Sequence, residues 1–110
     1  MTTNYKMLGQ TAPTAATETL NYTVPSSTST LVKAINVTNT SATADTYNIA
    51  LVTVAASAAT SAQFIAYENS IPGNSTVTIK AGYTLATGNG VRVNSTNGTS
   101  TFSTFGAEIS

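Results

Sequence analysis

The feature that most constrains this chain is the alternation of apolar and polar residues in Thr76–Lys80, where Val77 and Ile79 fall on one face. Alternation of this kind places successive side chains on opposite sides of a pleated sheet. A turn-forming sequence, Ile71–Asn74, separates this run from a second strand-like run, Phe64–Tyr67. The centre of the chain therefore predicts two strands joined by a turn.

Similar short runs occur along the rest of the chain, separated by clusters of Asn, Gly, Pro, Ser and Thr. The other expected strands are Thr19–Val24, Leu31–Thr38, Thr46–Val54, Val91–Val93 and Thr99–Phe105, with Tyr5–Leu8 as a further candidate. Their spacing is typical of a sandwich or barrel, and no helical periodicity competes with it. We predict an all-β fold: an antiparallel β-sandwich of about eight strands, with either jelly-roll or Ig-like connectivity.

The sequence leaves the facing of some strands open. Leu31–Thr38 fits two registers, and the more apolar one must carry Lys33 on its core face. Thr46–Val54 is apolar on both faces, which predicts partial burial on both, within a sandwich or an assembly. Phe102 and Phe105 are an odd number of residues apart, so a bulge or a strand end near Ser103 would be needed for both to face the core.

The predicted core combines the apolar residues of the inward faces. It consists of Leu20, Tyr22, Val24, Ile35, Val37, Tyr47, Ile49, Leu51, Ile65, Tyr67, Ile71, Val77, Ile79, Leu85, Val91, Val93 and Phe102.

A chain of 110 residues is expected to form one domain. The small, polar segment Thr11–Thr17 predicts a linker, so the residues before it fit either a core strand or an arm that orders on docking. We assign residues 1–17 to an N-terminal arm and linker, and residues 18–110 to the β-sandwich domain.

The charge pattern argues against nucleic-acid and membrane-surface binding. Four basic residues balance four acidic ones, and no basic cluster supplies the attraction that phosphates or anionic lipids require. A neutral chain also lacks charge repulsion between copies, which favours a homo-oligomer. The start of the chain has no signal-peptide pattern, so we expect synthesis in a cytoplasm without export by that route.

The composition also argues against enzymatic chemistry. The chain has no His and no Cys, which removes imidazole catalysis and makes zinc and copper sites unexpected. The acidic residues Glu18, Asp45, Glu68 and Glu108 are expected to be solvated or salt-paired, with Asp45 in a loop. We therefore predict no catalytic, cofactor-binding or metal site, and no cofactor.

The tyrosines are candidates for a sugar-stacking platform: they are Tyr5, Tyr22, Tyr47, Tyr67 and Tyr83. Alternation instead places Tyr22, Tyr47 and Tyr67 with the core residues, which favours buried rings with satisfied hydroxyls.

Several motifs, in this order along the chain, resemble a family of small virion proteins of tailed phages, including phages of cyanobacteria. They are Tyr5–Pro13, Tyr22–Pro25, Ile65–Pro72, Gly82–Leu85 and Phe105–Ile109. Together they extend over nearly the whole chain. The resemblance implies a β-sandwich structural subunit, either a capsid cement (decoration) protein or a piece of the tail or neck, without catalytic residues.

From this resemblance we expect a cement protein on the phage capsid surface that binds the major capsid protein and stabilises the shell. We do not expect an enzyme. A tail, neck or fibre component is the alternative within the virion, and a glycan-binding module or adhesin is the alternative outside that class. We expect capsid contacts at Thr2–Gln10 and Gly106–Ser110, and we expect deletion of residues 1–10 to leave a folded domain that no longer binds capsids.

Overall fold

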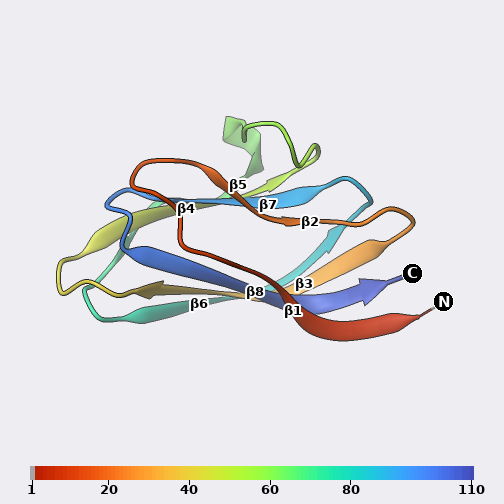
Figure 1. The fold of residues 1–110 in the computed structure, drawn as a ribbon, viewed down its shortest axis with the longest axis horizontal. Helices are drawn as coiled ribbons and strands as arrows, with labels where there is room; N and C mark the ends of the chain where they lie inside the picture. Colours follow the sequence, from red (N-terminus) through yellow and green to blue (C-terminus); the bar gives the residue numbers. More distant parts are fainter. Residues whose placement is uncertain (1) are drawn as a thin grey trace.

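The computed structural model describes residues 2–110 and contains eight strands and one short 3-10 helix. The elements are β1 (Thr3–Thr11), β2 (Thr19–Thr23), β3 (Ser29–Asn39), β4 (Asp45–Val52), η1 (Ser61–Gln63), β5 (Phe64–Ile71), β6 (Thr76–Leu85), β7 (Gly90–Ser95) and β8 (Ser100–Ile109). They form two antiparallel sheets packed face to face, which confirms the predicted all-β sandwich (Figure 1). Within residues 2–110, no helix has the length and apolar character needed to cross a membrane.

The strand order identifies the sandwich as a jelly roll. Sheet A has the order β1-β8-β3-β6, and sheet B has the order β2-β7-β4-β5. Strand β1 therefore pairs with β8, β2 with β7, β3 with β6 and β4 with β5, as when one long antiparallel hairpin is rolled up. Ig-like sheets instead contain several hairpins between consecutive strands. Among the described strands only β4 and β5 are consecutive and paired, so the structure decides between the two predicted connectivities.

Strand β1 is an edge strand of sheet A and not a separate arm. It runs along β8 from the pair Thr3 and Ile109 to the pair Thr11 and Phe102. Leu8 packs against the core from a bulge in this strand. The assignment of residues 1–17 to an arm and linker is therefore corrected: β1 belongs to the sandwich, and residues 12–18 form the connection to β2.

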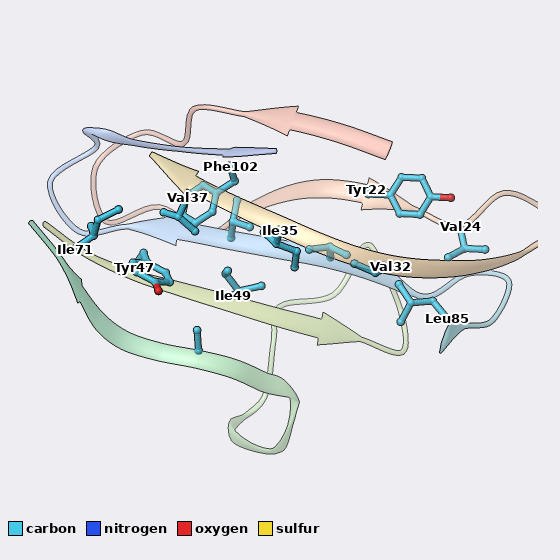
Figure 2. Packing of buried hydrophobic residues seen from close by; sticks show 13 residues of the cluster. Tyr22, Val24, Val32, Ile35, Val37, Tyr47, Ile49, Ile71, Leu85 and Phe102 are labelled. Atoms are coloured by element: carbon cyan, nitrogen blue, oxygen red, sulfur yellow. The ribbon is translucent and has the colours of Figure 1, made fainter. Parts of the chain in front are cut away.

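The core lies between the two sheets, where side chains of sheet A meet those of sheet B (Figure 2). The predicted core residues that are buried are Tyr22, Val24, Ile35, Val37, Tyr47, Ile49, Ile71, Leu85, Val91, Val93 and Phe102. Four others, Leu51, Ile65, Val77 and Ile79, are partly buried against this cluster. Leu20 and Tyr67 were predicted wrongly, since they are 39% and 60% exposed.

A β-bulge resolves the ambiguous register of β3. In the ladder with β8, Val32 pairs with Gly106 and Ala34 pairs with the next residue, Phe105, so Lys33 is an extra residue inserted at that point. Val32 faces the core before the bulge, and Ile35 and Val37 face it afterwards. Both predicted registers are therefore partly realised, and Lys33 stays exposed because the bulge moves it out of the alternation.

Strand β4 is buried on both faces, as its sequence predicted. Its inward face packs in the core, while Ala50 and Val52 on the outer face are also buried. The segment of residues 53–63, with η1, covers this outer face of sheet B (Figure 1). The Arg92 side chain secures the segment by donating from Nη1 to the Ala55 carbonyl at 2.8 Å. Residues 53–63 of the same chain therefore bury the outer face of β4.

Candidate interaction surface

The outer face of sheet A is divided into an apolar and a polar half. Residues directly opposite each other in an antiparallel pair share a face, so rows of side chains can be followed across the strands. Near the chain termini the rows are apolar: they are Tyr5–Ala107–Leu31 and Met7–Phe105–Ala34. Toward the opposite end the rows carry amides and hydroxyls: they are Gln10–Ser103–Asn36 and Thr101–Thr38–Thr76.

Strand β8 shows that these rows face outward. Phe102 and Thr104 are fully buried, so they point into the core. Ser103 and Phe105 therefore point away from it, because β8 alternates without an inserted residue along its whole ladder. Strand β8 has neither a bulge nor an end near Ser103, so that expectation is wrong. Phe105 lies outside the core, on the outer face.

We define the apolar half-face as Tyr5, Met7, Leu31, Phe105, Ala107 and Ile109. Tyr5 and Met7 on the edge strand are 73% and 47% exposed. Leu31, Phe105 and Ile109 are half-buried, and Ala107 is buried in its row between the larger Tyr5 and Leu31. A contiguous apolar area of this kind on a protein surface marks an interaction site more often than scattered apolar residues do.

The two chain ends predicted to make contacts lie side by side in this surface. Thr2 and Ser110 exchange backbone hydrogen bonds of 2.6 and 2.9 Å, and both termini emerge at the same end of the sandwich (Figure 1). Thr2–Gln10 and Gly106–Ser110 thus contribute neighbouring strands, β1 and β8, to one face. The expected removable arm is strand β1 in the structure, and its deletion would uncover the edge of β8.

Beneath the apolar half-face, a polar network joins the two sheets. The Tyr22 hydroxyl on β2 donates to Glu108 Oε2 on β8 at 2.6 Å and lies 2.7 Å from Thr30 Oγ1 on β3. Lys6 on β1 completes the network, with Nζ 3.0 Å from Glu108 Oε1.

The network shifts the pKa values of both of its acidic groups. Burial and the neighbouring Glu108 carboxylate raise the pKa of Tyr22 to about 12. The hydrogen bond from Tyr22, and then the Lys6 ammonium, hold the pKa of Glu108 below its ordinary value. Tyr22 therefore stays protonated and Glu108 ionised at neutral pH, so the pair acts as a structural link.

Asp45 is buried at the opposite end of the sandwich, where a solvated loop residue was expected. It is the first residue of β4 and is 2% exposed. Its Oδ2 accepts hydrogen bonds from Ser95 Oγ at 2.5 Å and Ser100 Oγ at 2.7 Å, and its Oδ1 accepts from the Asn97 N–H at 2.9 Å. Burial alone would raise the pKa of Asp45, but these donors outweigh burial and hold the pKa below its ordinary value.

The remaining carboxylates lie apart from these two. Glu18 Oε2 accepts from Arg92 Nε at 2.6 Å and from the Ala59 N–H at 3.1 Å, which ties the connection before β2 to the covering segment. Glu68 is exposed on β5. Across residues 2–110, no three acidic residues converge into a metal-binding group. Salt pairing is thus observed for Glu18 and Glu108, whereas the prediction for Asp45 is wrong.

The tyrosines divide between the core and the surface. Tyr22 and Tyr47 are buried, as predicted, and Tyr47 meets Phe102 edge-on with ring centroids 6.2 Å apart. Tyr67 instead projects from β5 beside Phe64, and together with Ser61 these residues border a hollow of about 450 Å³. Local alternation does not predict this exposure, because it does not show the ladder shifts around Ile49 that turn Tyr67 outward.

No family model, curated protein or solved structure matches the chain.

Proposed function

We propose that this protein is a virion structural protein of a tailed phage, and specifically a capsid cement protein that binds and stabilises the major capsid shell. The observation that carries the proposal is the apolar half-face, in which the two chain ends pair and present Tyr5 and Met7 to solvent. The resemblance of the sequence motifs to small phage virion proteins is the reason for proposing the major capsid protein as the partner. The jelly-roll topology is compatible with this role, since it recurs in viral capsid domains, although it also occurs in lectins.

The chemistry of the surface suits a shape-based contact. Aromatic residues and Met are enriched in the cores of protein interfaces, and a polar rim commonly surrounds them. Here the rows of Gln10 and Thr101 border the apolar half-face on its own sheet with amides and hydroxyls. Burial of the exposed parts of the Tyr5 and Met7 side chains would stabilise the complex by at most about 1.5–3 kcal/mol each before ordering costs are subtracted.

The same proposal includes a homo-oligomer on the shell. A chain with no net charge has little electrostatic repulsion between copies, which permits close packing around a local axis of the capsid. Light scattering on the purified protein, at several concentrations, measures whether it associates before it meets the shell.

Paired surface variants test the contact without disturbing the fold. The double variant Tyr5→Ser/Met7→Ser should bind shells assembled without the protein at least about tenfold more weakly than the wild type, a loss of about 1.4 kcal/mol. Tyr67→Ser is the control, because it removes another exposed tyrosine, from sheet B, and should leave binding unchanged. Co-sedimentation with the shells measures both.

Equal decoration by the double variant and the wild type would contradict the assigned surface. Labelling of the protein in intact virions tests the location separately: signal over the whole head supports a cement protein, and signal at a single vertex supports the tail or neck alternative instead.

A further inference from the structure

The hollow beside β5 combines aromatic walls with polar groups. Tyr67 and Phe64 form an edge-to-face pair, with ring centroids 4.9 Å apart and an interplanar angle of 64°. Ser61 of η1 completes the border of the hollow, whose volume is about 450 Å³. This volume is within the range typical of small-ligand sites, roughly 300–1,000 Å³.

The backbone of β5 turns Tyr67 outward. Between the pairs Tyr47–Asn69 and Ile49–Ala66, β5 carries two residues, Tyr67 and Glu68, opposite the single residue Asn48. Glu68 adopts a left-handed conformation, with φ of 49°, which is uncommon for a residue other than glycine. Bulges of this kind re-aim side chains and occur frequently beside functional sites.

Two amide side chains lie on the same outer face of sheet B as the aromatic pair. Asn48 Oδ1 accepts the Glu68 N–H at 2.6 Å, which fixes the bulge that carries Tyr67. Asn94 lies directly opposite Asn48 on β7. Among the described residues, its buried Oδ1 has no hydrogen-bond partner. The aromatic pair therefore shares this outer face of the sheet with amide groups.

We propose that the hollow at Ser61, Phe64 and Tyr67 binds a single neutral pyranose ring. A sugar ring has an apolar face of C–H groups that packs on an aromatic ring, and hydroxyls that pair with groups such as Ser61 Oγ and the tyrosine hydroxyl. The two rings stand at an angle and form two walls, so they suit one enclosed sugar unit better than an extended chain on a flat platform. Glu68, adjacent to Tyr67, disfavours acidic sugars by charge repulsion.

This site goes beyond the proposed function and does not depend on it. It lies on the outer face of sheet B, whereas the apolar half-face lies on the outer face of sheet A. A molecule held to a shell through sheet A would keep the hollow open to the surroundings, so both surfaces can be occupied at once.

An NMR titration of the ¹⁵N-labelled full chain tests the site with defined probes. The probes are the methyl glycosides of glucose, galactose, mannose and N-acetylglucosamine, with methyl sialoside as the acidic comparison. At least one neutral glycoside should shift the amide signals of Ser61, Phe64 and Tyr67 with a Kd on the order of 1 mM. Tyr67→Ala should weaken that binding at least about tenfold, equivalent to about 1.4 kcal/mol, while Tyr5→Ala, which removes an exposed tyrosine from the other sheet, should leave it unchanged.

Several results would overturn the proposal. They are the absence of shifts with every neutral glycoside at about 50 mM, roughly fifty times the expected Kd, unchanged binding by Tyr67→Ala, and equal shifts from cyclohexanol, which offers an apolar ring without the array of hydroxyls. Circular dichroism of Tyr67→Ala verifies its fold, and Tyr67→Leu provides a second variant that keeps apolar bulk. Shell binding by Tyr67→Ala should remain at the wild-type level, so failure of the sugar site and failure of the cement role give different results.

Discussion

Hydrogen bonds that involve a carboxylate link β8 to the opposite sheet at both of its ends, and we call these two links ties. The two ties differ in their partners and in their exposure. At its start, Ser100 donates to Asp45, which is 2% exposed and also accepts from Ser95 and the Asn97 backbone. At its end, Glu108 accepts from Tyr22 and pairs with Lys6, whose side chain is 42% exposed. One carboxylate is thus held by neutral donors in the interior, and the other by a hydroxyl and a counter-charge near the surface.

The difference indicates which tie holds the fold more strongly. A buried charge is costly unless hydrogen bonds replace the lost water, and removal of its partners leaves that cost uncompensated. An ion pair with a half-exposed lysine contributes little, because water and salt screen it. The end of the sandwich that carries Asp45 should therefore be more resistant to opening than the end where β1, β8 and the apolar half-face meet the termini.

Substitution of Asp45 should have the largest effect on stability. Asp45→Ala leaves the fully buried hydroxyls of Ser95 and Ser100 without their acceptor, at about 1–3 kcal/mol for each group, so we expect a total loss of about 4 kcal/mol. Chemical denaturation at pH 7 measures it. Glu68→Ala, at an exposed carboxylate, is the matched control and should change stability by less than about 1 kcal/mol. Similar losses for the two variants would remove the distinction between the buried and the exposed carboxylate.

Acid should weaken both ends of β8, and it should weaken the Asp45 end less than the substitution does. The folded-state pKa of Asp45 lies below its ordinary value of 3.8, and that of Glu108 lies below 4.5. Lowered pKa values contribute stability that is present above the ordinary values and lost as the pH falls through the folded values. Protonated carboxyls still accept hydrogen bonds, so the loss is only partial. Unfolding free energies measured from pH 6 to pH 2, roughly spanning the carboxyl range, should fall less steeply for Asp45→Asn than for the wild type. Identical slopes would show that Asp45 does not contribute to the acid response.

Alkali should act on the opposite end, through Tyr22. Its pKa is raised from 10.0 to about 12, so its contribution is complete below pH 10 and is lost as the pH rises through about 12. The corresponding loss is on the order of 2 kcal/mol. Tyr22→Phe should cost about 2 kcal/mol at pH 7, because Glu108 loses a buried donor, and should also remove this alkaline loss. An alkaline loss that persists unchanged in Tyr22→Phe would contradict the assignment to this hydroxyl.

The sequence predicted the parts of the fold that depend on local alternation. Val77 and Ile79 share the inward face of β6, and Val91 and Val93 share that of β7, because regular strands preserve the period. The prediction failed for Tyr67, because an inserted residue reverses the facing of a strand without changing its composition.

Connections between distant segments left no comparable signal in the sequence. Thr3 pairs with Ile109 at the other end of the chain, so neither the jelly-roll order nor the inclusion of β1 could be read from local patterns. Asp45 lies 50 residues from Ser95, and no motif joins an aspartate to a serine at such a separation. The apolar half-face was anticipated only in part: both ends of the chain were expected to make contacts, but their meeting on one face depends on the pairing of β1 with β8.

The smallest change in stability is expected for substitution of Lys6. This substitution tests the contribution of the Lys6 charge to the link at the Glu108 end of β8, separately from the Tyr22 hydroxyl. Lys6→Met keeps the apolar stem of the side chain but removes the ammonium that lies 3.0 Å from Glu108. We expect a loss of about 0.5 kcal/mol at low salt, which should largely disappear near 1 M NaCl, where the screening length is about 3 Å. Unfolding titrations at both salt concentrations measure it, and Lys80→Met, on the edge strand β6 of the same sheet, is the matched control. A loss as large as that of Asp45→Ala, persisting in high salt, would mean that the ion pair and not the Tyr22 hydroxyl secures the terminal end of β8, and that both ends are anchored equally.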